Sequence, residues 1–183
     1  MNELMQKEVV SRQDIYKDSL AIMDRLEKRK QLDIQFKEEQ GTGLGPTYEF
    51  FTLIAAAVRE AKDGKMWRTC QTSGTIFPSP IDAKSMTTDE LKEVSQLFRL
   101  AGTFVAKSIV DNKLIDLPIS KLMWDLLLGK VSEPKYCKAH AFDPVLFLYE
   151  QKLNLFDMRE LDEDHFRMLC EIQNMANRKK EIE

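Results

Sequence analysis

The sequence predicts a mainly α-helical domain with a small β element, an α+β fold. Apolar residues recur at helical spacing through most of the chain, whereas strand-like alternation is confined to Leu32–Lys37 and to short pieces of residues 66–80. The composition, 43% hydrophobic and 31% charged, is typical of a folded globular protein. A chain of 183 residues is long enough for one sizeable core.

Charge and composition exclude several classes of function. The net charge of -3 offers no electrostatic attraction to nucleic acid or to an anionic membrane. No apolar run is long enough to cross a bilayer, and residues 1–8 lack the apolar block of a signal peptide. Three cysteines are an odd and sparse set, which fits free thiols. We therefore expect a cytoplasmic or nuclear protein that binds neither nucleic acid nor membrane and needs no cofactor.

The chain is expected to begin with a helix followed by a strand. Residues 1–9 show no strong period and are free to fray, whereas Ser11–Lys30 carries apolar residues at helical spacing. Lys28, Arg29 and Lys30 then lie where the dipole at a helix end favours cations. Leu32–Lys37 alternates apolar and polar residues, which predicts a half-buried strand.

A glycine-rich turn, Gly41–Gly45, is expected to separate this strand from a second helix. Pro46 suits the first turn of that helix, and Lys62–Lys65 ends it. Because glycines alternate in a sharply bent segment, we predict a positive φ at Gly43 or Gly45. The apolar face of the helix comprises Phe50, Ile54, Ala57, Val58 and Ala61.

The middle of the chain predicts a small hairpin or two edge strands, and then the longest helix. Trp67–Cys70 and Thr75–Phe77 are β-like pieces around Ser73–Gly74. Thr87 and Glu90 have the spacing of a capping box, and Asp111–Asn112 allows the helix to end. The predicted core face of this helix comprises Leu91, Val94, Leu97, Phe98, Ala101, Phe104, Val105 and Ile109.

Three further helices are expected after the long one. Ser120 is placed to cap a short helix that Gly129 closes, and Asp143–Pro144 opens another. The last helix spans roughly Asp164 to Lys180, with the cluster at 162–164 at its start. Its apolar residues, which form an unusually wide face, are Phe166, Met168, Leu169, Ile172, Met175 and Ala176.

Each candidate chemical site has a stronger structural interpretation. Gly41–Gly45 lacks the dinucleotide spacing and the lysine of a P-loop, and Glu38 and Glu39 beside it would repel a phosphate. Cys137, His140, His165 and Cys170 could supply four zinc ligands, but positions 165 and 170 diverge by about 140° around one helix.

The cysteines are also weak candidates for a nucleophile. Cys70 lies near Arg68 but has no histidine close in sequence. Cys137 and His140 are close together, yet the stretch between them reads as a lysine-bearing surface loop. Paired-carboxylate catalysis by Asp162 and Asp164 is a remote alternative to a helix start. We therefore expect no catalytic, cofactor-binding or metal-binding residue.

Several segments, in order, resemble the HECT domain of ubiquitin ligases. They are Leu32–Phe51, with its strand, glycine turn and Glu-Phe-Phe helix, then 66–68, 76–80, Leu97–Pro118 and Asp143–Pro144. Residues 43–47, Gly-Leu-Gly-Pro-Thr, resemble the branch of the ubiquitin-fusion-degradation and thyroid-receptor-interacting ligases. Tyr48 departs from the arginine of most HECT domains, as this branch allows.

This resemblance implies that residues 10–157 are part of the large subdomain of a HECT amino-terminal lobe. Residues 158–183 would then be a terminal helix leading into the remainder. The family's mechanism is transthiolation, in which ubiquitin passes from a conjugating enzyme to a ligase cysteine and then to a substrate lysine. That cysteine lies in a Thr-Cys loop of the carboxy-terminal lobe, and Thr69–Cys70 lies in the wrong context to be it.

The resemblance therefore implies a scaffold that is inactive alone within an enzyme, a ubiquitin-protein transferase, that binds ubiquitin and a conjugating enzyme. The surface that recruits the conjugating enzyme is expected outside this chain. For the terminal helix we expect either a mobile helix in a monomer or a contact between two copies. The alternative function is a stand-alone helical interaction module without ubiquitin chemistry.

Overall fold

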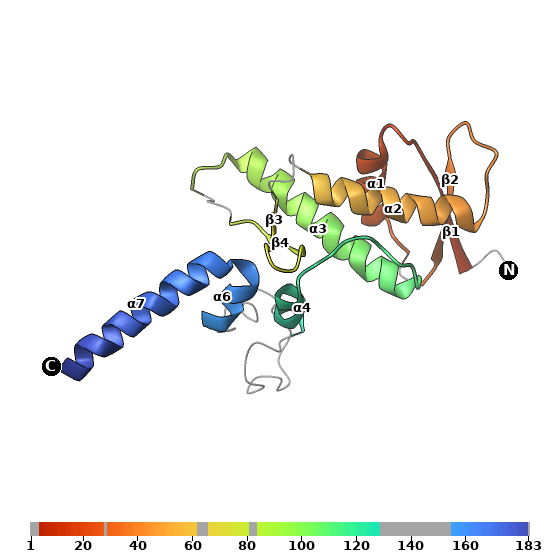
Figure 1. Cartoon of the computed structure of the whole chain (residues 1–183). Coiled ribbons are helices and arrows are strands. Elements are labelled where there is room, and N and C mark those ends of the chain that lie inside the picture. The colour runs from red at the N-terminus through yellow and green to blue at the C-terminus, as the bar shows by residue number, and fades with distance from the viewer. Residues whose placement is uncertain (1–3, 28, 62–65, 81–83, 129–154, 183) are drawn as a thin grey trace, which may run out of the picture. The chain divides into compact units, whose positions relative to one another are not determined.

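The computed structural model describes residues 4–27, 29–61, 66–80, 84–128 and 155–182. The chain forms two compact units, one of Met1–Met66 with Ser79–Leu117 and one of Trp67–Pro78 with Pro118–Glu183. Helices predominate in both units, and the strands make two small sheets (Figure 1). The predicted fold class, mainly α with a small β element, is confirmed. None of the helices in the described ranges is both long and apolar enough to cross a bilayer.

The first unit begins with a strand, a helix and a second strand. β1 (Met5–Val10) pairs in parallel with β2 (Gln31–Phe36), in a register that places Met5 opposite Gln31 and Val10 opposite Phe36. α1 (Ile15–Asp24) makes the crossover that parallel strands require. The strand over Leu32–Lys37 is thus confirmed, with its bounds one residue earlier.

The expectation that residues 1–9 fray is wrong for Met5–Val9, which belong to β1. The burial pattern of β1 hid it, because Gln6 faces the core while Val9 is 56% exposed. Gln6 is satisfied there: its amide donates to Glu8 Oε1 at 2.8 Å, and its oxygen accepts from the backbone N–H of Glu27 at 2.8 Å. A buried polar residue with partners at both ends costs little, although it masks the apolar alternation of a strand.

The first helix is shorter than the predicted Ser11–Lys30. It ends at Asp24, so Arg29 and Lys30 do not lie in its last turn, and the predicted interaction of these cations with its dipole is wrong. Lys30 instead pairs with Glu27 at 2.8 Å in the connection to β2, and its backbone N–H donates to the carbonyl of Glu27. The chain must reverse its direction between α1 and β2, because β2 runs parallel to β1, and this connection makes that reversal.

The core of the first unit lies between α2 (Leu44–Glu60), α3 (Thr88–Val110), α1 and β2 (Figure 1). The rings of Phe51 and Phe104 lie 5.5 Å apart, and Phe50 meets Phe51 edge to face at 6.1 Å. The fully or almost fully buried apolar side chains of this unit include Val10, Ile22, Leu32, Ile34, Phe36, Phe50, Phe51, Ile54, Val58, Leu97, Leu100 and Phe104. Most of the predicted helix faces are confirmed by this set.

The predicted capping box of α3 is confirmed, since Thr87 accepts from the backbone of Glu90 and the Glu90 carboxylate accepts from that of Thr87. Asp111 caps the end of the helix, and Asn112 adopts a positive φ of 52°. Ile109 was predicted in the core but is 67% exposed. The inward positions of the last turns are taken by Lys107, Ser108 and Asp111, which turns Ile109 outward.

Within the ranges that the structure describes, the second unit contains the predicted hairpin and the helices α4, α6 and α7. β3 (Trp67–Thr69) and β4 (Ile76–Pro78) pair antiparallel, which confirms the hairpin around Ser73–Gly74. α4 (Lys121–Leu127) is capped by Ser120, whose hydroxyl accepts from the backbone of Met123 at 3.1 Å. Ser120 also donates its backbone N–H to the carbonyl of Ile76 at 2.9 Å, which joins the hairpin to α4.

Residues 155–182 form two helices. α7 (Glu163–Ile182) confirms the predicted last helix, whereas α6 (Leu155–Leu161) was not predicted. Asp162 caps α7 by accepting from the backbone N–H of His165 at 3.0 Å, as the cluster at 162–164 indicated. The expectations for Lys62–Lys65, Gly129, Cys137, His140 and Asp143–Pro144 lie outside the described residues.

Candidate functional site

The glycine turn was the strongest local signal in the sequence, and its geometry is that of a structural bend. Gly43 has φ of 91° at the amino-terminal cap of α2, which confirms the predicted positive φ. Gly45 lies inside the helix and Pro46 in its first turn. A Cβ on Gly43 would meet no atom within 4 Å, so glycine is favoured there by backbone conformation and not by lack of space.

Thr47 ties this turn to the sheet. Its hydroxyl accepts from the backbone N–H of Ile34 at 3.0 Å and donates to the carbonyl of Gly43 at 3.2 Å. Only 1% of Thr47 is exposed. Because Ile34 lies in β2 and Gly43 caps α2, this one hydroxyl fixes the position of the helix start against the strand.

An arginine closes the outer side of the turn. Arg12 donates to Glu39 at 2.5 Å and to Glu49 at 2.5 Å, and its guanidinium lies 4.1 Å from the centre of the Phe36 ring. Its hydrogen bonds lower the pKa of both carboxyl groups, and those carboxylates raise the pKa of Arg12. The surroundings of the turn are therefore carboxylates already paired with one cation, which is unsuited to a phosphate.

A buried ion pair, which the sequence analysis missed, joins α3 to β2. Lys107 Nζ lies 2.8 Å from Asp111 Oδ1, with side-chain exposures of 1% and 0%. Lys107 also donates to the carbonyl of Lys30, and Asp111 Oδ2 accepts from the backbone N–H of Leu32 at 3.2 Å. Opposite charges four residues apart on the inward face of an apolar helix were the available signal.

The candidate metal and nucleophile residues are only partly within the described chain. Cys70 is 1% exposed, Cys170 is half-buried, and both are free thiols. The ring Nδ1 of His165 lies 2.7 Å from Asp162 Oδ2, and Arg68 bonds to the same oxygen. Among the residues that the structure describes, no three histidine, cysteine or carboxylate groups gather as a metal ion would require.

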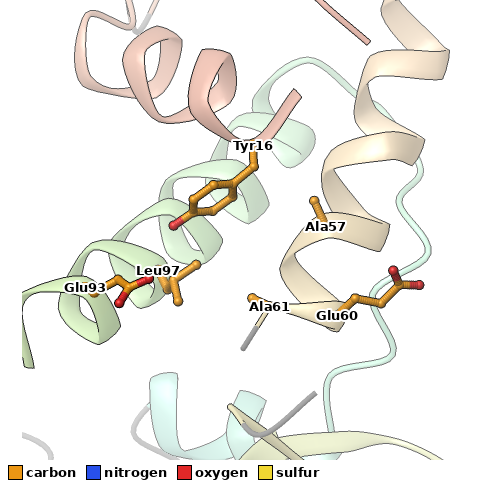
Figure 2. Close-up of a pocket in the computed structure, with 6 residues that line it drawn as sticks. All are labelled: Tyr16, Ala57, Glu60, Ala61, Glu93 and Leu97. Carbon is orange, nitrogen blue, oxygen red and sulfur yellow. The ribbon is translucent and has the colours of Figure 1, made fainter. Parts of the chain in front are cut away.

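A surface hollow of about 200 Å³ lies between α1, α2 and α3 (Figure 2). Tyr16 reaches from α1 toward Leu97 and Glu93 of α3, with Ala57 and Ala61 opposite on α2, whereas the carboxylate of Glu60 points away. Burial raises the pKa of Tyr16, and the charge of Glu93 raises it further. The six lining residues include no histidine or cysteine, and their ionisable groups are the phenol of Tyr16 and the carboxylates of Glu60 and Glu93.

Comparison with models of protein families shows to which family the chain belongs. Residues 46–183 match the model of the HECT-domain (ubiquitin-transferase). The chain belongs to the HECT family. The match runs from the first turn of α2 to residue 183, so it includes the hairpin and the last helix as well as α3 and most of α2, but not α1.

Curated relatives extend this match and indicate the branch. The E3 ubiquitin-protein ligase UPL4 of Arabidopsis thaliana is 32% identical over 190 residues, which cover 95% of this chain and 11% of UPL4. Ubiquitin fusion degradation protein 4 of Saccharomyces cerevisiae is 32% identical and covers 64% of this chain and 9% of its own length. The E3 ubiquitin-protein ligase TRIP12 of Danio rerio is 24% identical over 97% of this chain and 9% of TRIP12.

These relatives agree with the branch that the glycine turn resembles. The chain spans roughly a tenth of their length or less. Tyr48, which follows this turn in α2, is 48% exposed, and the ammonium of Lys113 lies 4.1 Å from the centre of its ring. A cation from the segment that follows α3 therefore lies against this ring.

Proposed function

We propose that this chain forms part of the large subdomain of a HECT amino-terminal lobe and acts there as a scaffold. The observation that carries the proposal is the match of residues 46–183 to the HECT domain. The packed unit around Phe51 and Phe104, the Thr47 link and the buried Lys107–Asp111 pair support it, because each holds a helix in place and none offers reacting groups.

We further propose that none of Cys70, Cys137 and Cys170 is the ligase cysteine. Cys70 is almost fully buried, and its backbone is held in the hairpin by a bond to Thr75 at 2.7 Å. Transthiolation requires the sulfur of one enzyme to reach the thioester of another, so a buried thiol is a poor acceptor. Cys170 lies on α7, where the ring Nδ1 of His165 is taken up by Asp162.

In the proposed parent enzyme, the thioester between ubiquitin and the conjugating enzyme is exchanged for one with the ligase cysteine. The substrate lysine then attacks that thioester, an amide forms, and the thiol leaves. This chain would supply none of the bonds that form or break. Its part would be to hold the surfaces that bring ubiquitin, the conjugating enzyme and the second lobe together.

The surface that recruits the conjugating enzyme is proposed to lie outside this chain. Titration of the whole chain with a panel of conjugating enzymes should give no binding at low micromolar concentration. The complete HECT domain of the yeast relative, titrated in parallel, provides the positive control. A dissociation constant below about 10 µM for this chain with any enzyme of the panel would contradict the proposal.

The alternative function, a helical interaction module without ubiquitin chemistry, draws support from the exposed apolar side chains of α7. Sequencing the full transcript separates the two proposals. A downstream lobe with a Thr-Cys loop favours the ligase, and a stop without it favours the module.

A further inference from the structure

α7 exposes a row of apolar side chains at the spacing of a coiled-coil seam. Met168 is 48% exposed, Ile172 50% and Met175 61%, and the steps between them are four residues and then three. Alternating steps of three and four keep side chains on one stripe along a helix, which suits a partner helix. α6 packs against α7 within the second unit, and Arg159 of α6 lies 5.9 Å from the centre of the Phe166 ring. This row is distinct from that contact.

Charges flank the row in a self-complementary way. The next position of the row, four residues after Met175, is Lys179. Glu171 and Arg178 lie on one side of the row, because each immediately precedes a residue of it, Ile172 and Lys179 respectively. They are seven residues apart, or about 10.5 Å along one helix, which is too far for a pair within it. On two antiparallel helices such flanking positions face each other, so Glu171 meets the partner's Arg178 and the reverse pair forms by symmetry.

We propose that α7 is a self-association surface that pairs antiparallel with α7 of a second copy of this chain. Ile172 packs against the partner's Met175 in two central layers, and Met168 covers the stem of the partner's Lys179. On the other side of the row, Leu169 packs on the partner's Ala176. A parallel pair is disfavoured, because it would set Lys179 against the partner's Lys179 and leave Glu171 beside the partner's Ala176.

The seam is short, which sets the strength of the contact. Only two layers are purely apolar, and the flanking charge pairs lie at the solvent-exposed rim, where they direct the pairing more than they strengthen it. We therefore expect a weak dimer that becomes populated between about 10 µM and 1 mM of chain. This inference does not depend on the proposed role in ubiquitin transfer.

The test is sedimentation equilibrium of the full chain with a charge-swap series. Glu171→Arg and Arg178→Glu should each weaken the dimer at least about tenfold, because each sets like charges together twice. The double variant should restore the dimer, and so should an equimolar mixture of the two single variants. Asn177→Arg, on the outer side of the helix, is the matched control and should dimerise as the wild type does. Circular dichroism at each step checks that α7 remains helical.

Two kinds of result would overturn the proposal: the absence of a dimer, and a dimer that does not depend on the proposed contacts. The first is a wild-type chain that remains monomeric up to about 1 mM. The second is a dimer that tolerates Ile172→Lys, or single charge variants that fail to recover when they are combined or mixed. Non-specific adhesion of exposed methionines would not restore a dimer when the two single charge variants are mixed. The mixing experiment therefore distinguishes a specific antiparallel pair from such adhesion.

Discussion

At the scale of single residues, the bend between β2 and α2 depends on the backbone conformation of Gly43. Its φ of 91° is rare for a residue with a Cβ, although space for that atom is open. Gly43→Ala should therefore lower the free energy of unfolding by at least about 1 kcal/mol through strain alone. Gly45→Ala, two residues later and inside the helix, should be neutral or stabilising. Urea unfolding of both variants measures this, and equal losses would contradict the account.

The buried Lys107–Asp111 pair predicts a strong asymmetry between single and double substitutions. Asp111→Ala leaves the ammonium of Lys107 buried and should cost about 3–5 kcal/mol. Lys107→Met combined with Asp111→Leu should cost less than the sum of the single changes, because no charge is left alone.

Asp116→Ala provides the control for this pair. Asp116 lies 3.3 Å from Arg59 with a side chain 78% exposed, so its loss should cost less than about 1 kcal/mol. Additive effects of the Lys107 and Asp111 substitutions in urea unfolding would show that the two groups are not coupled.

At the scale of elements, Arg12 connects the loop before α1 to the glycine turn and to α2. The lowered pKa of Glu39 and of Glu49 means that their pairing with Arg12 stabilises the fold fully above the ordinary carboxyl pKa of 4.5. That contribution is lost as the pH falls through the lower folded-state pKa values. Stability falls on acidification because, in this pH range, the carboxyl groups of the unfolded state bind protons more readily than those of the folded state do.

Arg12→Ala should therefore lower the thermal unfolding midpoint at pH 7, and the difference from wild type should shrink as the pH falls below 4.5. High salt should shrink it too, since the groups are exposed. Lys37→Ala removes an equal charge from a neighbouring surface position and serves as the control. A difference that grows toward acid pH would contradict this arrangement.

Whole elements were predictable where local signals agreed. The capping box at Thr87, the Ser120 cap and the alternation of Leu32–Lys37 each combine a periodic pattern with a start or stop signal. β1 was missed because its stability comes from pairing with a strand 26 residues away and because one of its two buried side chains, Gln6, is polar. Burial of Lys107 was missed for a similar reason. Its ammonium donates to the carbonyl of Lys30 in the turn before β2 and to Asp111, which in turn accepts from the backbone N–H of Leu32 in β2.

For the molecule as a whole, the family was recognisable because ordered segments of the chain carry it, from the glycine turn to Pro118. No arrangement of reacting groups contributed to that recognition. The glycine turn also shows the limit of a motif, because its carboxylates and its arginine already satisfy one another. Under the proposed function, this chain contributes the surfaces that it holds in place and supplies no reacting group.

The central claim, a HECT scaffold without the ligase nucleophile, is tested most directly by intact-mass measurement of ubiquitin adducts. The full chain and its Cys70→Ser, Cys137→Ser, Cys170→Ser variant are incubated with a ubiquitin-charged conjugating enzyme and sampled with and without reductant. The account predicts no rapidly formed, reducible adduct on either protein, with at most slow scavenging by the free thiols of the wild type. A fast reducible adduct on the wild type that is absent from the triple variant would contradict it.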